Sequence, residues 1–324
     1  MAGPTRDPGP AFGVPVPQVF LNGRADMGLV RRTLRRAEEL GFHGAWVQDQ
    51  VAGDVPLLEA MSLLAYAAAV TQRLKLGVSV LVLPIRNAPQ LAKCAGTLDH
   101  MSGGRLILGV GLGPVFAGDR YFRIFGASAG DALRRFNESV DVIKRLWTQD
   151  KVTIDGDYYH LHDACMEPKP LQQPHPPLWF GGQHPDALRR AVRVADGYMG
   201  AGPTTTGDFG QNVEHLRRFM DEQQRDPETL PISKRVYLAV DNDAERAKRR
   251  LDEFFARRYP WQIDANPNYV ADTCVWGSPA QVADGLARVL RLGADMIVLN
   301  PLWDFVEQLE TLAADVIPGL RQGI

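Results

Sequence analysis

The sequence predicts an α/β protein built as a (β/α)8 TIM barrel, with insertions after the fourth and seventh strands. Short apolar segments alternate with amphipathic helical segments along almost the whole chain, and eight apolar segments can be counted. The 324 residues, 45% of them hydrophobic, suffice for one barrel of about 250 residues with additional segments. Eight such repeats favour a closed parallel barrel over an open sheet.

The apolar segments give the expected positions of the eight strands. They lie at residues 18–21, 45–48, 74–83, 105–110, 178–180, 197–199, 235–240 and 296–299. The first of these is weak, whereas segment 74–83 is almost continuously apolar, as expected of a parallel strand covered on both faces.

Helices are expected between these strands, because apolar residues recur there with helical spacing. Their expected ranges are 28–40, 56–71, 89–101, 131–147, 186–195, 209–225, 244–258, 279–292 and 305–316. Gly103 and Gly104 should end one helix, and Ser278 with Gln281 should form a capping box at the start of another. Asp155-Gly156 predicts a hairpin with a type I′ turn, which interrupts the alternation.

Residues 1–13 are rich in proline and glycine, and we expect them to form a flexible tail before a single domain at 14–324. The tail lacks the basic start and apolar run of a signal peptide. No segment approaches the roughly 20 apolar residues of a membrane span. We therefore expect a soluble, cytoplasmic protein without membrane contacts.

Several classes of function are disfavoured by composition and spacing. The net charge is −2 and the basic residues are scattered, so no nucleic-acid surface is expected. Three widely spaced cysteines and seven histidines without HxH or HExxH spacing predict neither disulfides nor a metal site. The motifs of serine hydrolases and of phosphate-binding loops are absent.

Polar and glycine-rich residues follow several expected strands, at the end where a parallel barrel carries its active site. The candidates are Asp49 and Gln50 for catalysis, and Ser79, Val80, Gly111, Leu112, Gly113, Gly181, Gly182 and Gln183 for cofactor binding. Glycine at a strand end lets backbone amides approach a flat ring or a phosphate. A dinucleotide-binding fingerprint is disfavoured, because Pro114 stands where the third glycine is needed.

The order of motifs resembles the luciferase-like monooxygenase superfamily of flavin and deazaflavin oxidoreductases. The most specific match is residues 98–111, LDHMSGGRLILGVG. Residues 41–49 (GFHGAWVQD), 76–93, 168–182 and 195–197 are also similar to stretches of that family, in the same order.

The resemblance implies a TIM barrel, usually dimeric, that binds coenzyme F-420 (8-hydroxy-5-deazaflavin) or FMN. It further implies a cis peptide at Ser79-Val80 behind the cofactor ring, and cofactor binding by the Gly181-Gly182 loop. The chain departs from the deazaflavin members at Gln50, where many carry a histidine, because glutamine cannot act as a general base. It departs from the sugar-phosphate dehydrogenases at Pro114, where they carry an acid.

The sequence leaves three classes of function. The favoured one is hydride transfer between coenzyme F-420 and a small organic substrate, with an FMN-dependent monooxygenase as the alternative. A non-catalytic flavin-binding protein is a second class, suggested by Gln50. A hydrolase or lyase without a redox cofactor is disfavoured, because no nucleophile or metal cluster is present.

Overall fold

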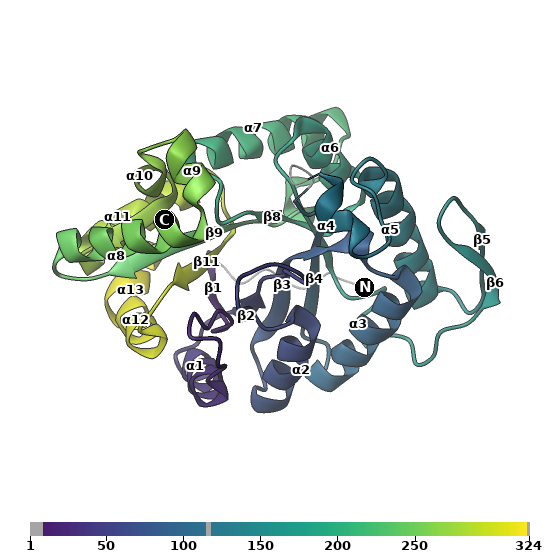
Figure 1. The fold of residues 1–324 in the computed structure, drawn as a ribbon, viewed down its shortest axis with the longest axis horizontal. Coiled ribbons are helices and arrows are strands. Elements are labelled where there is room, and N and C mark those ends of the chain that lie inside the picture. Colours follow the sequence, from purple (N-terminus) through teal and green to yellow (C-terminus); the bar gives the residue numbers. More distant parts are fainter. Residues whose placement is uncertain (1–8, 115–117, 323–324) are drawn as a thin grey trace.

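A computed structural model describes residues 9–114 and 118–322, and in it eight parallel strands close into a barrel (Figure 1). Round the barrel these are β1 (Ala11–Pro15), β2 (Gly44–Val47), β3 (Lys75–Val82), β4 (Leu106–Gly111), β7 (Leu178–Gly181), β8 (Gly197–Gly200), β9 (Ile232–Val240) and β11 (Met296–Pro301). The pairings of β11 with β1 and of β9 with β8 complete the ring. The predicted fold class is confirmed.

Helices surround the strands on the outside, as expected from their amphipathic patterns (Figure 1). The main ones are α1 (Met27–Glu39), α2 (Ala60–Val70), α3 (Ala88–Ser102), α5 (Ala132–Thr148), α6 (Pro185–Val194), α7 (Thr206–Glu222), α8 (Ala244–Arg258), α11 (Pro279–Arg291), α12 (Phe305–Thr311) and α13 (Ile317–Gln322). Within the described residues, no helix is long and apolar enough to cross a membrane.

Both expected insertions are present. After β4, the chain adds the short helix α4 (Asp119–Arg123) and, beyond α5, the hairpin of β5 (Val152–Asp155) and β6 (His160–Ala164), which projects at one edge of Figure 1. After β9, it adds α9 (Pro260–Ala265), α10 (Tyr269–Thr273) and β10 (Cys274–Gly277). β10 pairs with the last residues of β9 outside the ring.

The expected first strand at 18–21 is wrong, since β1 is Ala11–Pro15. Residues 11–13 therefore belong to the barrel and not to the tail expected at 1–13, whose residues 1–8 lie outside the described part. Phe12 is 2% exposed, and β1 is held on both sides by β2 and β11. The residues expected to form the strand instead follow it, and Gln18 donates to the carbonyls of Gln48 and Leu58.

The local signals are confirmed except at one turn and one helix start. Gly103 is left-handed at the end of α3, and Ser278 and Gln281 form the predicted capping box. The hairpin exists, but its loop spans residues 156–159 and Gly156 lacks the positive φ that a type I′ turn requires. Helix α2 begins at Ala60, four residues later than expected, because Glu59 caps it by accepting from the Ser62 N–H.

Two tryptophans fill the interior of the barrel. The rings of Trp46 on β2 and Trp179 on β7 lie 5.7 Å apart, and both residues are almost fully buried. Glycines on neighbouring strands make room for them: a Cβ at Gly13 would lie 2.6 Å from Trp46 Nε1, and one at Gly197 would lie 2.5 Å from Trp179 Cε2. A Cβ at Gly77 would overlap the Trp46 ring. The interior is therefore a packed core.

We expect Gly77→Ala to lower the free energy of unfolding by about 1–3 kcal/mol, because the added methyl group has no space beside Trp46. The matched control is Gly319→Ala, where a Cβ meets nothing within 4 Å and the helix should gain slightly. Urea unfolding of both variants measures the difference. Equal stabilities would contradict this account of the interior.

Candidate active site

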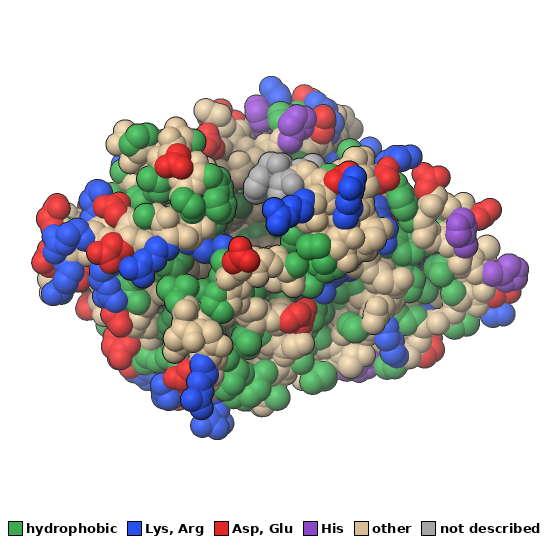
Figure 2. All heavy atoms as spheres, in the orientation of Figure 1, with side chains coloured by type: hydrophobic (Ala, Val, Ile, Leu, Met, Phe, Trp, Pro, Cys, Tyr) green, Lys and Arg blue, Asp and Glu red, His purple; other side chains and the backbone are tan. Residues whose placement is uncertain are grey.

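The carboxyl ends of the strands open into a hollow on the face seen in Figure 2. The segments that follow the strands surround it, with α4 on one side and α8, α9 and α10 on the other (Figure 1). In a parallel barrel, this is the end where ligands bind. All predicted site residues lie in the second half of β3, at the ends of β4 and β7, or in the segments that follow β2, β4 and β7.

Asp49 ties the ends of β2 and β3 together. Its side chain is 1% exposed; Oδ2 accepts from the Val82 N–H at 2.8 Å, and Oδ1 accepts from Arg86 Nη2 at 2.7 Å. Burial raises the pKa of Asp49, while the charge of Arg86 and the hydrogen bond from Val82 oppose that rise. With both oxygens engaged, Asp49 is suited to holding the strand ends in place.

Gln50 contacts the insertion that follows β9. Its Oε1 accepts a hydrogen bond from Arg258 Nη2 at 3.0 Å, and Arg258 is the last residue of α8. The amide end of Gln50 lies against Gly53, where a Cβ would overlap it. Gln50 therefore joins two segments that are 208 residues apart, beside the hollow.

The peptide bond between Ser79 and Val80 is cis, as the family resemblance implies. The side chain of Val80 fills the space that the neighbouring glycines leave: a Cβ would lie 2.7 Å from Val80 Cγ2 at Gly111, and 3.1 Å from it at Gly181. Gly113 is restricted by Val82 in the same way, and its φ is +80°. Close packing against β3 thus requires glycine at these positions, and Leu112 packs against the core. Cofactor binding by these glycines stays a prediction.

The loop after β7 is fixed to the strand and loop that follow it. Gly182 has a φ of +148°, and its carbonyl accepts from the Tyr198 hydroxyl at 2.8 Å. Gln183 Nε2 donates to Thr204 Oγ1 at 2.6 Å. The loop containing Thr204 is itself held by the buried ammonium of Lys234, which donates to the carbonyls of Ala201, Gly202 and Thr204.

Arg235 is a site residue that the sequence did not indicate. It lies on β9 with 2% exposure and points into the barrel, where Nη1 donates to Asn300 Oδ1 at 3.1 Å and Nη2 donates to Ser79 Oγ. Its buried Nε has no hydrogen-bond partner in the part of the chain that the structure describes. A basic residue inside a strand is usually read as a surface position, so no local pattern could have identified it.

A buried aromatic cluster packs α8 and α10 against β9, and its members Tyr237, Phe255 and Tyr269 are at most 3% exposed. The ring of Tyr237 lies 5.2 Å from that of Phe255, and Phe255 lies 5.7 Å from Tyr269. The hydroxyls of Tyr237 and Tyr259 are 3.1 Å apart. The cluster therefore fixes the insertion that follows β9 against the barrel.

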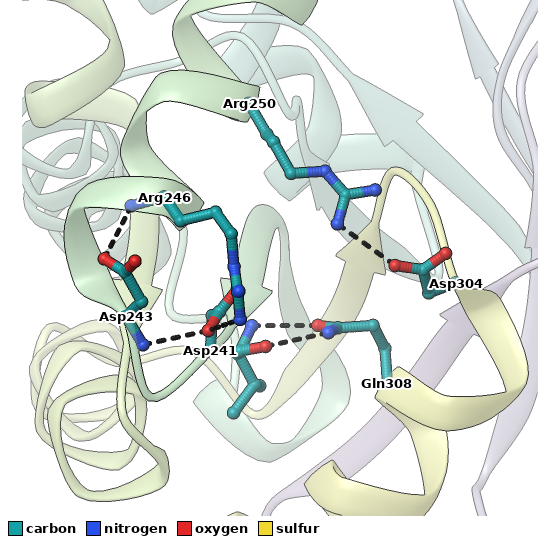
Figure 3. A network of polar contacts seen from close by, with 7 residues as sticks. Asp241, Asp243, Arg246, Arg250, Asp304 and Gln308 are labelled. Atoms are coloured by element: carbon teal, nitrogen blue, oxygen red, sulfur yellow. Dashed lines mark hydrogen bonds and ion pairs between the residues drawn. The ribbon is translucent and has the colours of Figure 1, made fainter.

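A polar network anchors the start of α8 (Figure 3). Arg246 pairs with Asp241 at 2.7 Å, and Arg250 pairs with Asp304 at 3.1 Å. Gln308 of α12 accepts from the Val240 N–H and donates to the Val240 carbonyl, both at 2.8 Å. These contacts hold the insertion to β9 and to the segment after β11.

The arrangement supplies binding and orientation. In the described part of the chain, no three His, Cys, Asp or Glu side chains are placed to hold a metal ion. The buried guanidinium of Arg235, with an unpaired Nε beside Ser79, fits an anionic ring above the Ser79-Val80 peptide. The residues present therefore fit a flavin or deazaflavin.

Residues 15–296 match the family model described as luciferase-like monooxygenase. The chain belongs to this family. One luciferase-like relative, an F420-dependent glucose-6-phosphate dehydrogenase from Kineococcus radiotolerans, is 34% identical over 88% of this chain and 91% of its own length. Another, an FMNH(2)-dependent dimethylsulfone monooxygenase from Pseudomonas putida, is 27% identical over 97% of this chain and 94% of its own.

Solved structures support the luciferase-like barrel. An F420-dependent secondary alcohol dehydrogenase, solved with an F420-acetone adduct, matches with a TM-score of 0.82 at 21% identity, covering 97% of this chain and 99% of its own. A monooxygenase from Streptomyces bottropensis matches with a TM-score of 0.81 at 22% identity, covering 95% and 99%. These likenesses establish the fold, and the family establishes an oxidoreductase.

We expect Gln50→Ala to lower turnover about tenfold with folding intact, because it removes the contact that fixes Arg258 beside the site. One positioned hydrogen bond contributes ~1–3 kcal/mol, and 1.4 kcal/mol corresponds to about a factor of ten. Steady-state kinetics measure the change, with the exposed Gln72→Ala at the opposite end of the barrel as control.

The companion variant Gln50→His adds an imidazole that titrates near pH ~6.5. We expect its turnover to depend on pH in that range, where the parent enzyme's does not. Unchanged kinetics and cofactor affinity in Gln50→Ala would contradict a role for Gln50 in the site.

Proposed function

We propose that this chain is an oxidoreductase that transfers a hydride between coenzyme F-420 and a small organic substrate. The observation that carries the proposal is Arg235, a buried cation that donates to the uncharged side chains of Ser79 and Asn300. An anionic ring is the kind of ligand that such a cation stabilises. Relatives named as F420-dependent, one of them 34% identical, support coenzyme F-420 as the ring.

In this proposal the bound cofactor supplies the two-electron chemistry. Val80 would lie behind its ring, Arg235 would face the charge, and the loop from Gly181 to Gln183 would contact the phosphate side. Asp49 would hold the ends of β2 and β3 in place, and Gln50 would orient the substrate through its amide. Neither Asp49, which is fully engaged, nor Gln50 offers a free general base.

FMN-dependent monooxygenation is the second candidate. It is supported by the relative named as an FMNH(2)-dependent dimethylsulfone monooxygenase, which aligns with 97% of this chain. In both candidates the reduced ring can carry a negative charge, so Arg235 is compatible with either. A homodimer and a cytoplasmic location remain predictions from the sequence and the family resemblance.

Titration of the purified chain with coenzyme F-420 and, separately, with FMN tests the proposal. We expect saturable binding of coenzyme F-420 with an affinity at least tenfold higher than that of FMN, followed by changes in absorbance and fluorescence. Thr204→Val, which removes the acceptor of Gln183, should weaken binding, whereas Gln72→Ala should leave it unchanged. Preferential binding of FMN would favour the monooxygenase, and binding of neither would overturn both candidates.

A further inference from the structure

Arg235 extends across the whole interior of the barrel. It starts on β9 and donates to Ser79 on β3, which lies four strands away in either direction round the ring. It also donates to the amide oxygen of Asn300 on β11. Ser79 and Val80 are only half-buried, so the guanidinium meets β3 where the site is open.

The hydrogen bonding of Arg235 is incomplete in comparison with the other buried cations. Arg105 is 8% exposed, and its five donors find oxygen acceptors on Ser102, Thr71, Leu74 and Ala68. Lys234, the neighbour of Arg235, reaches three carbonyls. Among the described residues, Arg235 makes two hydrogen bonds, and its Nε makes none.

No carboxylate compensates the charge of Arg235 within the described residues. Asp49, the acid among the predicted site residues, is engaged by Arg86 and Val82. A buried guanidinium without a counter-ion is costly, and the cost falls when a ligand brings the missing negative charge. The unpaired Nε thus indicates a ligand group that is anionic in the state that binds best.

We infer that Arg235 stabilises the negative charge of the reduced cofactor ring and thereby raises its reduction potential. The inference rests on the proposed function and deepens it. A hydride brings two electrons and one proton, so the ring gains one negative charge on reduction, while the alcohol proton of an oxidised substrate leaves to water. The guanidinium favours the more negative form and therefore binds the reduced cofactor more tightly than the oxidised one.

Asn300→Asp is the sharpest test, because it keeps the shape of Asn300 and places a carboxylate 3.1 Å from Arg235 Nη1. With its charge matched by the protein, Arg235 should lose its preference for the reduced ring. We divide the dissociation constant of the oxidised cofactor by that of the reduced cofactor, for FMN and for coenzyme F-420. We expect this ratio to fall at least tenfold in Asn300→Asp. For a two-electron couple this lowers the midpoint potential by about 30 mV.

Two substitutions of Arg235 separate charge from packing. Arg235→Met should lower the midpoint potential of the bound cofactor, as Asn300→Asp does. Arg235→Lys keeps the charge and should leave the midpoint potential close to that of the parent. The matched control is Asn212→Asp, which adds the same charge at a 6% exposed asparagine on α7 and should leave the potential unchanged.

Thermal unfolding of the cofactor-free chain gives a second readout. Asn300→Asp should raise the melting temperature, because it supplies the counter-ion that Arg235 lacks, whereas Asn212→Asp should lower it. If Asn300→Asp binds a cofactor with the same ratio of dissociation constants as the parent, the inference is overturned and the proposed function stands. Binding of neither cofactor by the parent chain would overturn both.

Discussion

The packing of Trp46 against Trp179 inside the barrel is the constraint on which the site depends. The two rings come from β2 and β7 and lie 5.7 Å apart. They require small residues opposite them, and Gly13, Gly77 and Gly197 supply these. Because this layer fills the interior, ligands can enter only from the carboxyl ends of the strands, where Ser79 and Arg235 form the next layer.

The course of the chain could be predicted wherever local pattern and tertiary environment agree. The strands β3 and β4 are apolar along their length because they are covered on both faces. In the helices that cover the strands, apolar residues recur with the spacing that places them on one face. β1 was missed because its sequence, AFGVP, contains glycine and proline, which are typical of loops. Its stability comes from β2 and from β11, which is nearly the whole chain away in sequence.

The first part of the most specific motif, residues 98–105, lies at the opposite end of the barrel from the site. Arg105 closes the end of α2 through the carbonyls of Ala68 and Thr71, and Asp99 accepts from Gln172. These contacts stabilise the fold, so the motif identifies the family without indicating what the barrel binds. Asp49 and Gln50 could be placed at the site from strand order, but their partners Arg86 and Arg258 could not, since those contacts depend on how the segments meet in space.

The position of Arg235 inside the barrel likewise depends on the tertiary structure. Lys234 and Arg235 are adjacent basic residues in a strand, and only the alternation of faces sends one side chain to the outer loop and the other across the barrel. Arg235 is 2% exposed, so little water reaches its guanidinium. Low polarity increases both the cost of the unmatched charge in the free protein and its effect on a bound anion. An unmatched buried charge lowers the stability of the free protein. A ligand that gains negative charge during the reaction offsets this loss.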